Sequence, residues 1–167
     1  MGIQYNQIAR EIIYTYPNGK EEIVDNDFAS KPVYSPNRKQ VVFISPLEWE
    51  TIGKIYRYDL DTHKKSILVE FNNEKLAPKD VVWLDEENLA VILGMAFGTI
   101  SIGGDIYTYN IKTEKFKRVT EVEHHVQYTS LEVDVDASND VLIARGIEYT
   151  DEKFTQHLEF TKQFKWK

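Results

Sequence analysis

The feature that most constrains this chain is a short pattern that returns about every 50 residues. Residues 13–16, 55–58 and 106–109 each read Ile-Tyr-x-Tyr, and a looser copy begins at His157. Each of the first three copies is followed by a polar turn and a second strand-like run. This composition and spacing are typical of a β-hairpin. The repeat therefore predicts one small β unit that is used several times.

A second shared hairpin lies upstream of the later copies, beginning at residues 33–36, 82–85 and 133–136. Each unit thus contains four short strands joined by tight turns. Because a lone sheet of four strands cannot bury both of its faces, the units must stack against one another. Radial stacking of such sheets is a β-propeller. We predict an all-β fold, a propeller-like stack of about three four-stranded antiparallel blades, with a β-sandwich of the same strands as the alternative.

The repeat sets the expected organisation of the chain. We predict a single domain over residues 1–167, with a half-blade at 10–26 and blades at 31–71, 80–121 and 131–164. Propellers typically close with about four to eight blades, so closure within one chain is not expected. Three arrangements stay open, namely an open curved stack, a ring completed by a partner chain, and a part of a larger propeller. Unpaired terminal strands at 10–24 and 154–162 could also join two copies as a homodimer.

Composition narrows the classes of partner. Aromatic residues make up 13% of the chain, which favours strands. The net charge of −7, without a basic run among the aromatics, argues against nucleic acid as a partner. The absence of cysteine removes disulfides, thiolate catalysis and cysteine-ligated zinc. No apolar run reaches the roughly 18 residues of a membrane span. The first residues do not resemble a signal peptide, so we expect a cytoplasmic chain, or an extracytoplasmic one whose leader has been removed.

Two stretches resemble known bacterial families. Residues 31–45, Lys-Pro-Val-Tyr-Ser-Pro-Asn-Arg-Lys-Gln-Val-Val-Phe-Ile-Ser, resemble the blade opening of the TolB-like, WD40-like repeat family. Residues 46–53 and 97–110 are similar to an uncharacterised bacterial domain family, found mainly in Gram-positive bacteria, for which no activity is established. Together these resemblances imply a bacterial propeller-like domain, and they supply no catalytic residues.

The predicted topology gathers certain loops. In a propeller, the loops between the second and third strands of each blade emerge on the same face as the connections between blades. The segments brought together here are 46–53, 72–79, 95–104, 122–130 and 146–153. Loops carry function more often than scaffold strands do, so this face is the predicted binding face. The candidate ligand- or partner-binding residues on it are Glu48, Trp49, Glu50, Phe97, Ser101, His124, His125 and Tyr149.

Two of these loops have unusual compositions. Trp49, between two acidic residues, could stack a sugar or a cationic group, but we favour its folding back as a lid over the core. The loop at 94–104 is rich in glycine yet lacks the spacing of a phosphate-binding loop. We interpret Gly98, Gly103 and Gly104 as permitting bulges or positive φ in a long twisted hairpin.

Polar clusters give weaker signals. His124 and His125 are adjacent, so on a strand they point to opposite faces and suit one metal ion poorly. Asp134 and Asp136 share a strand face, and with Asp85 and Glu86 could form an acidic ring or a glycosidase pair. We favour solvated acids in turns. Neither a metal site nor a cofactor is predicted.

The tyrosine pairs of the repeat alternate onto one strand face. We expect the pairs at positions 14 and 16, 56 and 58, and 107 and 109 to pack between blades, with each hydroxyl reaching a partner at the rim.

Two functions remain open from the sequence. The favoured one is a non-enzymatic binding or interaction module whose ligand is a protein, a small molecule or a carbohydrate. The alternative is a hydrolase, or a hydrolase's accessory domain, acting on carbohydrate or peptide through paired carboxylates. A binding module should expose aromatic side chains around Trp49 and Phe97, whereas an enzyme should hold two close, desolvated acids in a cleft.

Overall fold

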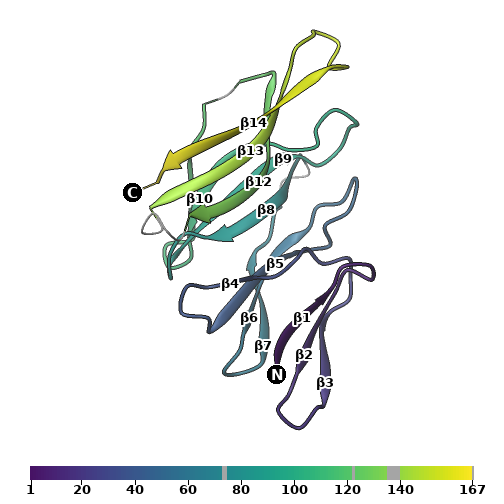
Figure 1. Ribbon diagram of the computed structural model, residues 1–167, viewed down its shortest axis with the longest axis vertical. Helices are drawn as coiled ribbons and strands as arrows, with labels where there is room; N and C mark the ends of the chain where they lie inside the picture. Colours follow the sequence, from purple (N-terminus) through teal and green to yellow (C-terminus); the bar gives the residue numbers. More distant parts are fainter. Residues whose placement is uncertain (73–74, 122, 135–139, 167) are drawn as a thin grey trace.

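The computed structural model of the protein describes residues 1–72, 75–121, 123–134 and 140–166. Within these ranges the chain forms fourteen strands, arranged as four antiparallel sheets. In the part of the chain so described, no helix is long and apolar enough to cross a membrane. The four sheets follow one another along the long axis of the molecule, from the N-terminal sheet to the C-terminal sheet (Figure 1).

Each sheet is built from strands that are consecutive in the sequence. The first sheet contains β1 (Gly2–Asn6), β2 (Glu11–Thr15) and β3 (Glu21–Asp25). The second contains β4 (Val33–Tyr34), β5 (Gln40–Ser45), β6 (Lys54–Asp59) and β7 (Lys64–Val69). The third contains β8 (Leu76–Trp83), β9 (Asn88–Met95), β10 (Asp105–Asn110) and β11 (Lys115–Arg118). The fourth contains β12 (Val126–Asp134), β13 (Val141–Tyr149) and β14 (His157–Lys165).

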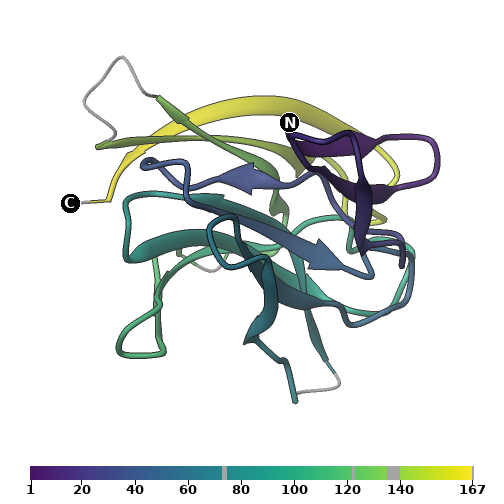
Figure 2. The same cartoon turned by 90° about the horizontal axis from the view of Figure 1, so that it is seen from below.

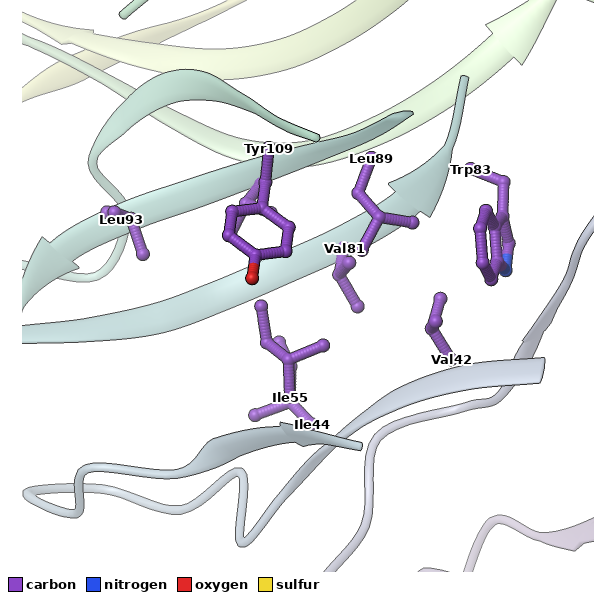
Figure 3. Packing of buried hydrophobic residues seen from close by; sticks show 9 residues of the cluster. Val42, Ile44, Ile55, Val81, Trp83, Leu89, Leu93 and Tyr109 are labelled. Carbon is purple, nitrogen blue, oxygen red and sulfur yellow. The ribbon is translucent and has the colours of Figure 1, made fainter. Parts of the chain in front are cut away.

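The core lies between the sheets. In β5, Val41 and Phe43 pack against the first sheet, while Val42 and Ile44 pack against the third. Figure 3 shows the latter interface, with Val42 and Ile44 facing residues of the third sheet. Successive side chains of a strand point to opposite faces, so a strand covered on both faces needs an unbroken apolar run. This is why β5 reads Val-Val-Phe-Ile.

The C-terminal sheet is covered on one face. In β13, Leu142 and Ala144 are fully buried against the third sheet, whereas Arg145 on the other face is exposed. Most of β14 is exposed. The stack is therefore open, with β14 along its outer side as seen from below in Figure 2, and the predicted all-β, propeller-like fold is confirmed.

Three details of the predicted repeat are wrong. The half-blade gains a third strand, β1, which pairs with β2 over Gly2–Asn6. In β2 the register shifts directly after Ile12, and in β6 it shifts directly after Ile55. Ile12 is therefore the equivalent of Ile55, in place of the predicted Ile13. His157 pairs with Tyr149 near the tip of a longer hairpin, whereas Ile106 pairs with Ile92. His157 therefore does not occupy the position of Ile106 in its sheet.

The tyrosine pairs pack between sheets, as predicted. Tyr14 and Tyr58 are buried together between the first and second sheets. Tyr109 is buried between the second and third sheets, where its hydroxyl donates to the carbonyl of Leu68 at 3.4 Å. The hydroxyl of Tyr16 donates to Glu22 at the rim.

The glycines of the loop at 94–104 serve two different purposes. Gly98 has φ of 107°, as positive φ was predicted there. Gly103 and Gly104 have no positive φ, which was one of the two alternatives predicted for them. An added Cβ at Gly103 would lie 2.2 Å from the carbonyl oxygen of Tyr128, and one at Gly104 would lie 2.0 Å from that of Leu93. These two glycines permit close backbone approach.

Candidate functional site

Hydrogen bonds tie each predicted loop to the connection that enters its sheet. Leu47 N donates to Phe28 O at 3.0 Å, Ala96 N to Lys75 O at 2.8 Å, and Tyr149 N to His125 O at 2.8 Å. The loops between β5 and β6, between β9 and β10, and between β13 and β14 lie along one side of the stack, the right-hand side in Figure 1. We call this side the loop face. The predicted segments 72–79 and 122–130 include residues 73, 74 and 122, which lie outside the described residues.

The loop at 95–104 is held against the fourth sheet. Gly104 and Tyr128 exchange two backbone hydrogen bonds, of 3.0 and 2.8 Å. The carbonyl of Ile100 accepts from Gln127 Nε2 and from the hydroxyl of Tyr149, both at 3.1 Å. Tyr149, a predicted binding residue, therefore fixes the shape of this loop.

The loop at 46–53 is anchored from the first sheet. Ser45, just before it, donates its hydroxyl to the buried carboxylate of Asp25 at 2.8 Å, and Lys65 pairs with the same carboxylate at 2.6 Å. Arg10 pairs with Glu48 at 3.5 Å and donates to the carbonyl of Leu47. Glu48 is thus already neutralised by a partner.

A cavity of about 260 Å³ lies between these two loops. We call it the Trp49 pocket, and its lining residues are Leu47, Glu48, Trp49, Glu50, Lys79, Ala96, Gly98, Ser101 and Ile102. The structure therefore brings four of the predicted residues together, namely Glu48, Trp49, Glu50 and Ser101.

A second depression lies along the loop at 95–104, between Met95 and Phe154. This Phe97 groove has a volume of about 460 Å³ and is lined by Met95, Phe97, Gly98, Thr99, Ile100, Ser101, His124, Gln127 and Phe154. It contains the predicted residues Phe97, Ser101 and His124. His125 is not part of either lining, because its ring stacks on that of Phe154 with centroids 5.3 Å apart.

Apolar side chains are exposed along the loop face. Trp49 is 59% exposed, so the prediction that it covers the core is wrong. The anchors at Arg10 and Asp25 fix the backbone of its loop and leave the indole outside. Met95 is also 59% exposed and Phe97 49%. Ile100 lines the Phe97 groove with Met95 and Phe97, and Ile102 lines the Trp49 pocket with Trp49; both have similar exposure. Together these five residues form an apolar patch.

Lys79 is a member of the Trp49 pocket that the sequence analysis missed. The register of β8 against β9 shifts between Pro78 and Asp80, so Lys79 occupies a β-bulge, a feature that re-aims a side chain. Burial lowers the pKa of its amine. Pro78 was the available signal, because proline inside a strand is confined to edges and bulges.

Asp80 is a desolvated acid but not half of a catalytic pair. Its carboxylate accepts hydrogen bonds from Leu131 N at 2.7 Å and from Val81 N at 2.9 Å. Burial raises its pKa to about 6, against the lowering effect of these two amides. No second carboxyl group takes part in that shift. The arrangement joins the inner strands of the third and fourth sheets.

The Asp80 carboxyl gives the stability of the fold a pH dependence. Its folded pKa of about 6 lies above the ordinary 3.8, so the folded state binds more protons than the unfolded state between these values. The contribution of Asp80 to the free energy of unfolding therefore increases as the pH falls through 6. When the pH is lowered from 7 to 5, the free energy of unfolding in urea should change by about 1 kcal/mol more favourably for wild type than for Asp80→Asn. An equal difference at both pH values would contradict this role.

Of the four acids considered for an acidic ring, Asp85 and Glu86 are engaged within and between turns. Asp85 accepts from the backbone amides of Glu87 and Asn88, both at 2.8 Å, within its own turn. Glu86 accepts from Asn37 N at 2.7 Å and so links two neighbouring turns. Asp136 lies outside the described residues. Asp85 and Glu86 are turn acids, and no metal-binding group of three His, Cys, Asp or Glu occurs among the residues described.

A cavity larger than these two lies elsewhere, between the inner strands β4, β8 and β12. It has a volume of about 540 Å³. Trp83 in its wall is 4% exposed and donates its indole N–H to the carbonyl of Val33 at 3.1 Å. The indole is therefore committed to joining the second and third sheets. We regard the loop face as the better candidate, because its aromatic side chains are exposed and not used in packing.

Comparison with known proteins agrees with this fold. The family profile described as "Domain of unknown function (DUF4652)" matches residues 13–163. No curated protein matches the sequence. Among solved structures, one described as a conserved lipoprotein from Clostridium novyi NT shares 28% identity with a TM-score of 0.72, over 83% of this chain and 88% of that one.

More distant structures share the propeller fold. TolB from Acinetobacter baumannii is 15% identical with a TM-score of 0.56, and the alignment covers 97% of this chain but 40% of TolB. The β-propeller domain of the Trilobed protease from Pyrococcus furiosus, which has an open velcro topology, is 15% identical with a TM-score of 0.55. This chain is covered over 99% of its length and that domain over 49%. Such likenesses concern the fold alone.

Proposed function

The chain belongs to the DUF4652 family of unknown function, and from that premise we propose that it is a non-enzymatic module that binds a polypeptide partner on its loop face. The observation that carries this proposal is the exposed apolar patch of Trp49, Met95, Phe97, Ile100 and Ile102. Exposed apolar side chains that gather around neighbouring depressions on one side of a domain mark interaction sites.

The chemistry of the patch favours a polypeptide over a carbohydrate. Methionine and aromatic residues are enriched in protein interfaces, and Met95 and Phe97 lie together in the lining of the Phe97 groove. Methionine also adapts its shape to varied partners. A sugar would need several polar groups around a flat ring, whereas Met95, Phe97 and Ile100 present apolar surface.

The hydrolase alternative finds less support in this geometry. It requires two close acids in a cleft. Glu48 is paired with Arg10, and Asp80 is bonded to backbone amides away from the lining of both loop-face cavities. A protease is among the proteins whose propeller domains share the fold, but fold does not determine activity.

The related Clostridium novyi protein suggests a cellular setting. It is described as a lipoprotein, and from that description we infer a binding event outside the cytoplasmic membrane. We extend that setting, in a Gram-positive bacterium, to this chain as part of the proposal.

A selection from a phage-displayed peptide library tests the proposed function. Peptides enriched on the wild-type protein should bind at least about tenfold more weakly to Phe97→Ala, because burial of a phenylalanine contributes roughly 1.5–3 kcal/mol. The matched control is Ile67→Ala on β7, since Ile67 is 50% exposed but lies away from both cavities. Affinities measured by calorimetry should be unchanged in this control. Failure to enrich peptides, or equal affinities for Phe97→Ala and wild type, would refute the proposal.

A further inference from the structure

We propose that the Trp49 pocket recognises a single carboxylate group, with Lys79 as its counter-ion and the Trp49 indole covering the adjoining apolar part of the ligand. This inference rests on the proposed function, because the carboxylate would belong to the polypeptide held on the loop face. It adds the chemical class of the group that the pocket accepts.

Lys79 is a half-buried cation that has no ionic partner in the part of the chain that the structure describes. Among the described residues it makes no ion pair and no hydrogen bond, although its side chain lines the pocket. Burial disfavours the charged form of an amine unless an anion compensates for the lost hydration. The lowered pKa of Lys79 agrees with such desolvation. A carboxylate entering the pocket would supply the missing anion.

The remaining charges in the pocket favour a single negative charge over a double one. Glu48 is neutralised by Arg10. Glu50 is exposed at the edge of the loop and makes no ion pair among the described residues. A carboxylate beside Lys79 gains attraction from the amine and only moderate repulsion from Glu50 across solvent. A phosphate dianion would gain attraction and repulsion in the same proportion, but it would lose more hydration on entering the half-buried pocket.

The other lining residues suit a small apolar body next to the carboxylate. Leu47, Ala96 and Ile102 supply apolar walls, and the exposed indole of Trp49 supplies a flat surface. The hydroxyl of Ser101 has no hydrogen-bond partner among the described residues and can donate to the same carboxylate. A volume of about 260 Å³ matches one side chain more closely than an extended peptide.

Two small probes of the same shape test the inference. 3-Phenylpropanoate carries the carboxylate, and 3-phenylpropanamide replaces it with a neutral amide. Binding is followed through the indole ¹⁵N–¹H signal of Trp49, which a Trp49→Phe variant identifies among the three tryptophans of the chain. The variants are Lys79→Gln, the conservative Lys79→Arg, and Lys64→Gln as a control for an exposed lysine outside the pocket.

Wild type and Lys64→Gln should bind the acid at least tenfold more tightly than the amide. This ratio should fall to about one in Lys79→Gln and should be largely restored in Lys79→Arg. N-acetylphenylalanine and the amidated dipeptide acetyl-Phe-Glu-NH₂ then distinguish a chain-terminal carboxylate from one on a side chain. Equal binding of acid and amide, an unchanged ratio in Lys79→Gln, or no shift of the Trp49 signal would each overturn the inference.

The outcomes separate this inference from the proposed function. If library peptides require Phe97 but are indifferent to Lys79→Gln, the binding module stands and the carboxylate site falls. If the acid probe binds through Lys79 while no library peptide is enriched, the pocket stands and the polypeptide partner falls.

Discussion

Replacing Gly104 with alanine is expected to lower the free energy of unfolding by about 3–5 kcal/mol, the range of the most damaging single substitutions. The new Cβ would lie 2.0 Å from the carbonyl oxygen of Leu93 and 2.6 Å from the Cα of Gly94. Both are backbone atoms, so no side-chain rotation relieves the clash. Moving Gly104 would also break its two hydrogen bonds with Tyr128, which join the third and fourth sheets.

A second glycine provides the control for this prediction. Gly19 has φ of 81°, and nothing lies within 4 Å of a Cβ added there. Gly19→Ala should therefore cost only about 1 kcal/mol, from backbone strain alone. Both variants can be compared by urea unfolding monitored by circular dichroism. A Gly104→Ala variant no less stable than Gly19→Ala would show that the close crossing of these backbones is unimportant.

The fold was predictable because its information is local and repeated. Strand length, turn composition and the spacing of Tyr56 and Tyr58 recur along the chain, and a four-stranded unit that must stack leaves few architectures. The apolar run of β5 also shows in the sequence that both faces of the second sheet are covered.

The ends of the stack were harder to predict, because pairing there depends on tertiary contacts. β1 has only Ile3 and Tyr5 to pack against the core, so its five residues resemble a turn flank more than a strand. The hairpin of β13 and β14 stays paired as far as Tyr149 and His157. This longer pairing moves His157 to a different position in its sheet, although its distance along the chain from the earlier copies is unchanged.

The candidate site was predictable only in outline. Topology brings Trp49 and Ser101 to one pocket, since both lie on loops that leave the same side of the stack. The outward placement of the indole depends on the anchors Arg10 and Asp25, which come from a different sheet. The position of Lys79 depends on a bulge, and a bulge changes the face of a side chain without any change in residue type.

Replacing Ile44 with alanine is expected to lower the free energy of unfolding by about 2–5 kcal/mol, as for other fully buried isoleucines. Ile44 is 0% exposed and packs between the second and third sheets. In Ile143→Ala the same residue type is changed in β13, on the half-buried outer face of the fourth sheet beside Glu132 and Gln163. The free energy of unfolding of Ile143→Ala should fall by about 1 kcal/mol or less, because the substitution deletes only a little buried apolar surface.

The pair of isoleucine variants also distinguishes an open stack from one completed by a second chain. If another copy covered the fourth sheet, Ile143 would lie in an interface, and Ile143→Ala would cost as much as Ile44→Ala. The unfolding midpoint would then also rise with protein concentration. For an open stack, we expect the two costs to differ by at least twofold and the midpoints to be independent of concentration. Each sheet would then be stabilised by its neighbours in the same chain, and the loop face would be complete in the monomer.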